Sequence, residues 1–220
     1  MLAQRYCHTF CAAVAVAFND ITFYFTSTTG SSAALFGGTI VHSACHLNKK
    51  KITDILRKAW EDVHILIIDK ISFFKVSEML KLDKQLKRLT GRSDVPFGGM
   101  SIVFSGDFHQ LQPVGSLNEV LYSLSPGGQW WENTINCAIF LENSHRFKDD
   151  PYYGQILDRI RMGKDTKEDR EMINSRVVGQ GGVNLPEDPD TCYACPTNKE
   201  RNGITAGIFK KHIIDTHPTI

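Results

Sequence analysis

A run of apolar residues at positions 63–68 predicts a buried strand that ends at Asp69. Five of these six residues are apolar, and a continuous apolar run is typical of a strand covered on both faces, as in a parallel sheet between helices. In open α/β sheets, ligands bind outside the carboxyl ends of the strands. On this stretch alone, a ligand site at Asp69 and an ordinary solvated turn are equally supported.

The remaining pattern predicts an α/β chain around this strand. β-Branched and aromatic residues predict further strands at 21–26, 100–105, 137–141 and 191–196. Helices are predicted at 1–18, 52–60, 75–90, 167–176 and 197–211, with another beginning at Pro151 and a short one ending at Phe36. Residues 126–128 are predicted to form a turn before a short element.

The predicted helix at 75–90 is amphipathic and charged. Leu80, Leu82, Leu86 and Leu89 are expected to mark its buried side. Its lysines favour a solvated face over a binding patch. Because parallel strands need a crossover connection, this helix favours a parallel pairing of the strands that end at Asp69 and at Ser105.

Two carboxylates and an amide follow these two strands. Asp69 ends the first strand, and Asp107 and Gln110 follow the second. If the strands are parallel neighbours, the three side chains converge at one edge of the sheet. This donor set suits Mg²⁺ carrying a polyphosphate, because Mg²⁺ binds one or two carboxylates plus phosphate oxygens.

Two other polar features leave alternatives open. The hydroxyl-rich turn at 27–32 opens a short helix, which suits a phosphate at the helix N-terminus and equally a simple helix cap. Arg146 follows the predicted strand at 137–141, where its guanidinium is able to reach a phosphate or to form a surface salt bridge.

Composition narrows the class of protein only slightly. The 220 residues carry a net charge of +1, so any nucleic-acid binding has to come from local basic patches and specific loops. The six cysteines form no framework, which suits a reducing compartment. The apolar run at 10–18 is too short to span a bilayer, and no membrane partner is expected.

Several segments, in order, resemble the petite-integration-frequency (Pif-type) ATP-dependent DNA helicases of superfamily one. One such motif is weakly specific, whereas the ordered set is highly specific and covers nearly the whole chain. The matching segments are 26–30, 37–38, 42–43, 66–72, 97–99, 106–114, 141–146, 156–163 and 196–202.

The resemblance implies a RecA-like fold of the P-loop NTPase class with a mostly parallel sheet. Residues 1–145 would form the first lobe, and residues 146–220 the start of a second RecA-like lobe that is mainly helical. It further implies that ATP binds between the lobes and that single-stranded or forked DNA runs across them. Translocation would be five-prime to three-prime.

The resemblance also assigns roles to the residues of the nucleotide site. Asp69 would hold Mg²⁺, and Gln110 would contact the γ-phosphate and the attacking water. Asp107 would orient the Gln110 loop. Arg146 would stabilise charge in the transition state.

In the DNA-binding segments, the resemblance places Thr29, Gly30 and His42 against the DNA backbone. By analogy with the family, the chain would act in DNA repair, recombination and telomere maintenance. Its compartment would be the nucleus or the mitochondrion.

Three departures from the family pattern affect the expected activity. No G-x-x-x-x-G-K-[ST] sequence occurs, so the loop and lysine that cradle phosphates are missing from the chain. Lys70 stands where the family carries the glutamate that polarises water, and a charged lysine has no acceptor for a proton. Ile40 and Gln112 replace a threonine and a proline of the family.

The leading prediction is therefore an ATP-dependent DNA helicase core that hydrolyses ATP poorly or not at all. The chain looks like an internal piece of a helicase or a decayed copy. The alternative is a non-catalytic module that binds single-stranded nucleic acid. A small P-loop kinase is the third hypothesis, and it is weakened by the missing phosphate loop.

Overall fold

The computed structural model describes residues 21–35, 37–115, 119–141, 147–177 and 192–216. The predicted helix at 1–18, the predicted site residue Arg146 and residues 178–191 lie outside these ranges. The chain divides into two compact units, residues 1–148 and 149–220.

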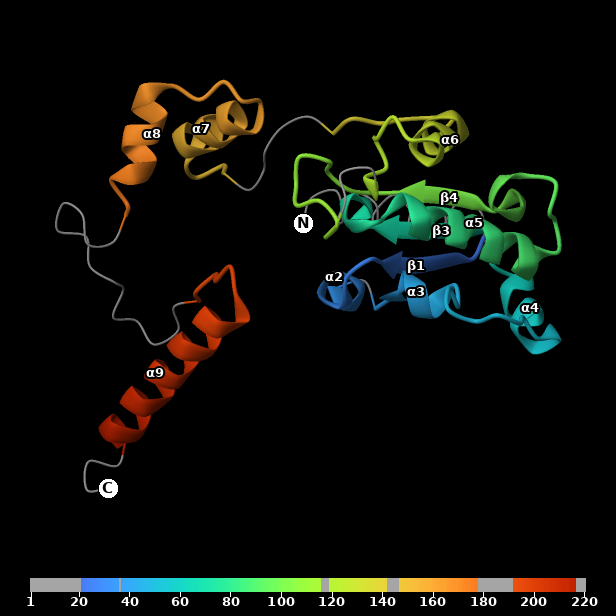
Figure 1. Ribbon diagram of the computed structural model, residues 1–220, viewed down its shortest axis with the longest axis horizontal. Helices are drawn as coiled ribbons and strands as arrows, with labels where there is room; N and C mark the ends of the chain where they lie inside the picture. The colour runs from blue at the N-terminus through green and yellow to red at the C-terminus, as the bar shows by residue number, and fades with distance from the viewer. Residues whose placement is uncertain (1–20, 36, 116–118, 142–146, 178–191, 217–220) are drawn as a thin grey trace. The chain divides into compact units, whose positions relative to one another are not determined.

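The first unit is built on a sheet of four parallel strands in the order β2-β1-β3-β4, of which Figure 1 shows β1, β3 and β4 side by side. The strands are β1 (Phe23–Ser27), β2 (Thr39–Ile40), β3 (Ile65–Asp69) and β4 (Ser101–Phe104). The predicted strands at 21–26, 63–68 and 100–105 are confirmed. The pattern does not predict β2, because two residues are too few to show an alternation.

The strands on either side of β3 are aligned so that all three end together. Ser27 of β1 pairs with Asp69, and Phe104 of β4 pairs with Ile68. Ile68 is fully buried, as expected for a strand in the middle of the sheet. The predicted parallel pairing of β3 with β4 is confirmed.

Short helices connect and cover these strands. They are α2 (Gly30–Leu35), α3 (Val41–Ala44), α4 (Asp54–Glu61), α5 (Val76–Thr90) and α6 (Pro126–Thr134), with 3₁₀ turns at Ile71–Phe73 and Pro96–Gly99. The predicted turn at 126–128 is wrong, because Pro126 begins α6 and Ser125 caps it by accepting a hydrogen bond from the Gly128 amide at 3.2 Å.

The main core lies between the sheet and α5. Leu82 and Leu86 are fully buried and Leu89 nearly so, as predicted. The fourth predicted position is wrong, because Leu80 is 43% exposed and Met79 is buried instead. Along a helix, Leu80 lies about 200° from Leu82 and Met79 only about 60° from it. The buried side therefore includes Met79.

The predicted strand at 137–141 does not form. Ile139 and Phe140 are 82% and 87% exposed, and no described strand pairs with this segment. The described part of the predicted strand at 191–196 also lacks a ladder partner. Both segments have strand composition, but a strand also needs a neighbour to receive its backbone hydrogen bonds.

A buried carboxylate fixes the turn that leads into β4. Asp83 on α5 accepts a hydrogen bond from the Phe97 amide at 2.6 Å. Its carboxylate also forms an ion pair with Lys87, at 2.9 Å. Gly98 follows with a φ of 63°, and a Cβ there would overlap Thr90 Oγ1. The close approach of this turn to α5 therefore requires glycine at position 98.

The second unit contains α7 (Pro151–Arg161), α8 (Lys167–Asn174) and α9 (Asn198–Thr216), which agree with the helices predicted there. Arg159 of α7 donates two hydrogen bonds to the buried carboxylate of Asp169 in α8, at 2.6 and 2.7 Å. The Thr166 amide donates a third at 3.0 Å. The Arg159 guanidinium holds the pKa of Asp169 well below its usual range.

Replacing Asp83 by alanine is expected to destabilise the first unit by about 1–3 kcal/mol, because the buried Phe97 amide loses its acceptor. Urea unfolding of the whole chain measures the change. Asp94→Ala is the control, since Asp94 is exposed on the same connection. Equal effects of the two substitutions would contradict the role given to Asp83.

The Asp169–Arg159 pair predicts a pH-dependent stability. Since the folded pKa of Asp169 is depressed, its contribution is present above the unfolded pKa of about 4 and is lost as the pH falls through the folded value. Asp169→Asn should lower the melting midpoint of the helices at pH 7, with a difference that shrinks in acid. Circular dichroism measures it, and Glu171→Gln, whose side chain is 65% exposed, is the control. A difference that does not change with pH would contradict this.

Candidate active site at the carboxyl edge of the sheet

The strand ends bring the predicted nucleotide-site residues to one edge. Beyond the last paired residues, the Ser105 amide donates to the Ile68 carbonyl at 2.9 Å and the Ile71 amide donates to the Ser105 carbonyl at 3.1 Å. The chains that leave β3 and β4 therefore run side by side. Asp69 and Asp107 lie on these two chains, which is the arrangement that the sequence predicts.

Asp69 is buried at this edge, with only 3% of its surface exposed. Ser32 of α2 donates a hydrogen bond from Oγ to Asp69 Oδ2 at 2.5 Å. Ser32 itself is buried. A carboxylate and a hydroxyl are hard oxygen donors of the kind that Mg²⁺ takes, so the donor set fits the predicted metal role of Asp69.

Hydroxyl groups at the end of β1 connect it to the end of β3. Thr26 Oγ1 donates to the Ile67 carbonyl at 2.7 Å, and Thr28 Oγ1 donates to the Lys70 carbonyl at 2.9 Å. Thr29 Oγ1 accepts from the Ser32 amide at 3.4 Å. These contacts favour the structural alternative for the hydroxyl-rich turn, because several of its hydroxyls already bind the backbone.

Lys70 connects the two loops at the edge. Its backbone is left-handed, with φ 60° and ψ 41°, a conformation that costs energy for residues other than glycine. Its Nζ donates to Gln110 Oε1 at 3.3 Å. The side chain of the residue after Asp69 therefore contacts the predicted phosphate-sensing glutamine.

Asp107 holds the loop that carries Gln110. The Gln110 amide donates to the Asp107 carbonyl at 3.0 Å, and Gln110 Nε2 donates to Asp107 Oδ2 at 3.5 Å. Asp107 Oδ1 also accepts from the His109 amide at 3.0 Å. This is the geometry expected of a residue that orients the Gln110 loop.

Two residues of this edge are missed by the sequence reasoning. Ser32 contacts Asp69, and Gly106 packs so closely that a Cβ there would lie 2.8 Å from Ile71 Cγ2 and 2.9 Å from the Ile71 nitrogen. The signal for Gly106 is a glycine between a strand and a carboxylate. Ser32 belongs to the hydroxyl-rich turn at 27–32, but nothing in the sequence connects it to Asp69, which is 37 residues away.

The predicted DNA-binding residues lie beside this edge. Gly30 is exposed at the start of α2. A Cβ at Gly30 would lie 3.6 Å from Cδ1 of Ile40, so α2 begins close to the segment that carries His42. Thr29 is half-buried. His42 is also half-buried, and its Nε2 lies 3.1 Å from Glu78 Oε1.

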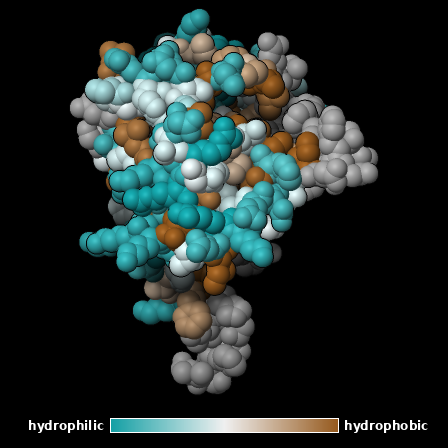
Figure 2. Space-filling model, turned by 90° about the vertical axis from the view of Figure 1, so that its right-hand side faces the viewer, coloured by the Kyte–Doolittle hydropathy of each residue, from teal (hydrophilic) through white to brown (hydrophobic). Residues whose placement is uncertain are grey.

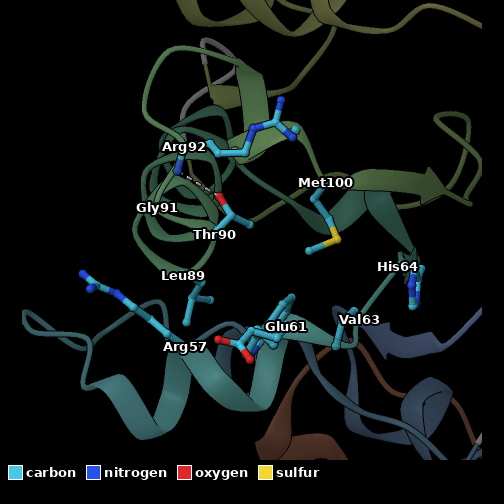
Figure 3. A pocket seen from close by; sticks show the side chains of 12 residues that line it. Arg57, Glu61, Val63, His64, Leu89, Thr90, Gly91, Arg92 and Met100 are labelled. Carbon is cyan, nitrogen blue, oxygen red and sulfur yellow. Dashed lines mark hydrogen bonds between the residues drawn. The ribbon is translucent and has the colours of Figure 1, made fainter.

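A pocket of about 410 Å³ lies at the opposite, amino ends of β3 and β4. Figure 3 shows Arg57 and Glu61 on one side and Arg92 and Met100 on the other. The Arg92 amide donates to Thr90 Oγ1 at 3.3 Å. Since β3 spans five residues, roughly 13–17 Å, the pocket is separate from the edge that holds Asp69.

Two other features, a metal-binding cluster of side chains and a membrane-spanning helix, are absent from the described residues. None of their His, Cys, Asp and Glu side chains form a group of three or more placed to hold a metal ion. Over the same part of the chain, no helix combines the length and the apolar character needed to cross a bilayer.

Comparison with known proteins identifies a matching family and several relatives. Residues 13–171 match the family described as PIF1-like helicase. The ATP-dependent DNA helicase RRM3 of Saccharomyces cerevisiae is 32% identical over 153 residues, which cover 64% of this chain and 21% of that protein. Uncharacterized protein 030L of Invertebrate iridescent virus 6 is 29% identical over 188 residues, covering 77% of this chain and 35% of that protein.

Solved structures show a similar fold. The Pif1 helicase of Candida albicans superposes with a TM-score of 0.71 at 24% identity, covering 92% of this chain and 47% of that one. Bacteroides Pif1 bound to ssDNA gives a TM-score of 0.65 at 19% identity, covering 90% and 49%. The chain thus spans about half of these solved chains and about a fifth to a third of the curated relatives above. The predicted α/β, RecA-like fold with a parallel sheet is confirmed.

Ser32→Ala is expected to destabilise the first unit by about 1–3 kcal/mol, because the buried Asp69 carboxylate loses a hydrogen-bond donor. Ser31→Ala is a matched control, since Ser31 is exposed in the same helix. Urea unfolding of both variants measures the difference. An equal effect at the two serines would show that the contact with Asp69 contributes nothing.

Proposed function

Because the chain belongs to the PIF1-like helicase family, we propose that it is the nucleotide- and DNA-binding core of an ATP-dependent DNA helicase, with hydrolysis impaired at Lys70. One observation carries this proposal. Parallel pairing of β3 with β4 brings Asp69, Asp107 and Gln110 to a single edge, and Lys70 contacts Gln110 there.

Asp69 is the proposed anchor for the metal and the nucleotide. Its carboxylate, with the Ser32 hydroxyl at 2.5 Å, offers the oxygen donors that would hold Mg²⁺. When bound, the ion neutralises charge on the phosphates of ATP. Burial of Asp69 keeps the carboxylate in one orientation, which suits a reaction that depends mostly on positioning.

Gln110 is the proposed contact to the γ-phosphate and the attacking water. Asp107 orients it through the two hydrogen bonds that it accepts from Gln110. Arg146 is proposed to stabilise the transition-state charge, which in phosphoryl transfer is worth about 10³–10⁵ in rate.

Lys70 weakens this site in two ways. A charged lysine has three donors and no acceptor, so it is unable to take a proton from the attacking water. Its ammonium also engages Gln110 Oε1 at 3.3 Å, the oxygen through which the amide would accept a hydrogen bond from that water. Hydrolysis is impaired, whereas the added positive charge favours the binding of phosphate.

Single-stranded or forked DNA is the proposed partner, held at Thr29, Gly30 and His42. Similar structures include Bacteroides Pif1 bound to ssDNA and a pair of Pif1 helicases at forked dsDNA. We propose five-prime-to-three-prime translocation for the complete helicase. Its proposed setting is repair, recombination and telomere maintenance in the nucleus or the mitochondrion.

A non-catalytic module that binds single-stranded nucleic acid is the second candidate. The contact between Lys70 and Gln110 favours it, because it places a cation, and not a base, beside the glutamine proposed to contact the attacking water. The two candidates differ in whether a chain that carries a phosphate-binding loop, and a glutamate in place of Lys70, hydrolyses ATP.

Joining an upstream segment that ends in a G-x-x-x-x-G-K-T loop, and replacing Lys70 by glutamate, is expected to restore DNA-stimulated ATP hydrolysis. The Lys70→Glu form should hydrolyse ATP about 10²–10⁴-fold faster than the same fusion with Lys70, since a general base contributes about that factor. Phosphate release measures the rate. Lys58→Glu, at an exposed position of α4, controls for the change in charge.

Three outcomes distinguish the alternatives. Equal, substantial hydrolysis by the fusion that keeps Lys70 and by the Lys70→Glu fusion would overturn the account of Lys70. DNA binding without hydrolysis in either fusion would favour the non-catalytic module. The absence of both DNA binding and hydrolysis would overturn the proposed function.

A further inference from the structure

A basic groove lies on the first unit between the segment that follows α3 and helix α5. It has a volume of about 420 Å³, and five of its eight lining residues are Lys or Arg while none is acidic. We propose that this groove binds the phosphate backbone of a DNA strand. Its cations are Lys49, Lys50, Lys81, Lys84 and Arg88.

Hydrogen bonds hold the two walls of the groove together. Gln85 on α5 is 3% exposed, and its Nε2 donates to the carbonyls of His46 at 2.7 Å and Lys49 at 2.9 Å. Arg88 Nη1 donates to Gln85 Oε1 at 3.1 Å and to the Lys50 carbonyl at 3.5 Å. The backbone that carries Lys49 and Lys50 is therefore held against α5, which keeps both lysines at this wall of the groove.

Nearby carboxylates have other partners. Asp83 binds Lys87 and the Phe97 amide, and Glu78 binds His42. The carboxylate of Glu119 accepts hydrogen bonds from Ser77, which lower its pKa, and Lys75 and Lys81 lower it further. Across the described residues, Lys49, Lys50 and Lys84 form no ion pair.

The groove places like charges together at a cost to stability. Lys81, Lys84 and Arg88 lie three and four residues apart on α5, a spacing at which like charges repel. The net charge of the whole chain is only +1, so a general excess of basic residues does not explain this cluster. A bound polyanion would offset the repulsion.

The fold alters the expectation drawn from α5 alone. The lysines of the helix by themselves favour a solvated face, but the structure adds Lys49 and Lys50 from a segment more than 30 residues away in the sequence. Convergence of two segments on one groove is typical of a binding surface. Figure 2 shows hydrophilic side chains spread widely over the face of the molecule seen there.

The length of the groove suits several phosphates of one strand. His42 contacts Glu78 near the first turn of α5, and Arg88 lies in its last turn. The α5 residues that line the groove run from Lys81 to Arg88 and span roughly 10 Å, which is about three phosphates of a duplex strand at 3.4 Å each. A strand held at His42 can therefore continue along α5. The choice of DNA as the partner rests on the proposed function.

The chemistry of the groove favours DNA over a lipid surface. Peripheral membrane binding needs exposed apolar side chains beside the cations. The single aliphatic side chain in the lining, Leu47, is 8% exposed. A backbone of phosphates needs cations alone, and each phosphate that is neutralised releases counterions.

The test compares two triple variants with the same change in charge. Lys49→Gln, Lys50→Gln and Lys84→Gln together remove three groove cations, whereas Lys58→Gln, Lys164→Gln and Lys199→Gln remove three exposed lysines that do not line the groove. Binding of fluorescent single-stranded and duplex DNA is measured by anisotropy across a salt series. Thermal unfolding checks that both variants fold.

The groove variant is expected to bind DNA about tenfold or more weakly, with a salt slope reduced by about two to three, because each phosphate contact contributes about 0.7–0.9 to the slope. The control variant should match the unmodified chain. Equal DNA binding by both variants would overturn the proposal that the groove binds DNA, and would leave the proposed function intact.

Two other results would contradict the groove proposal. Failure of the unmodified chain to bind any DNA would overturn both the groove and the proposed function. Vesicles containing phosphatidylserine form a further arm of the test. If the groove variant loses binding to these vesicles and keeps full DNA binding, the groove recognises a lipid surface instead of DNA.

Discussion

Parallel pairing of β3 with β1 on one side and β4 on the other is the constraint on which the rest of the first unit depends. Ser27 pairs with Asp69, and Ile68 pairs with Phe104, so three strands end at one edge. Side chains that follow strands far apart in the sequence are brought together there. The hydrogen bond between Lys70 and Gln110 forms only because this alignment places their two loops side by side.

Buried carboxylates then fix the pieces around this sheet. Burying a charge costs free energy unless it is hydrogen-bonded or paired, and each buried aspartate here connects two elements. Asp69 joins β3 to α2 through Ser32, and Asp83 joins α5 to the turn before β4. Within the second unit, which is separate from this sheet, Asp169 joins α7 to α8. The positions of these helices and turns are therefore set by polar contacts as well as by the apolar core.

The extent to which the sequence predicts this arrangement depends on how local each feature is. The apolar run at 63–68 and the leucines of α5 identify β3 and α5, because burial leaves a periodic signal. Residues 137–141 have strand composition without a partner strand, and local composition carries no information about partners. Ser32 and the close packing of Gly106 escape prediction for the same reason, since both depend on distant residues.

Lys70 shows how one residue changes what the geometry of such an edge is able to do. Its left-handed backbone, with φ 60°, turns the chain out of β3, and its side chain reaches the loop of the neighbouring strand. A glutamate there would add an acceptor for a proton, whereas lysine adds a cation beside Gln110. The basic groove along α5 adds more cations on the same unit. Both features favour holding polyanions, and neither supplies a base. These two features therefore support the proposed binding of nucleotide and DNA and the proposed loss of hydrolysis.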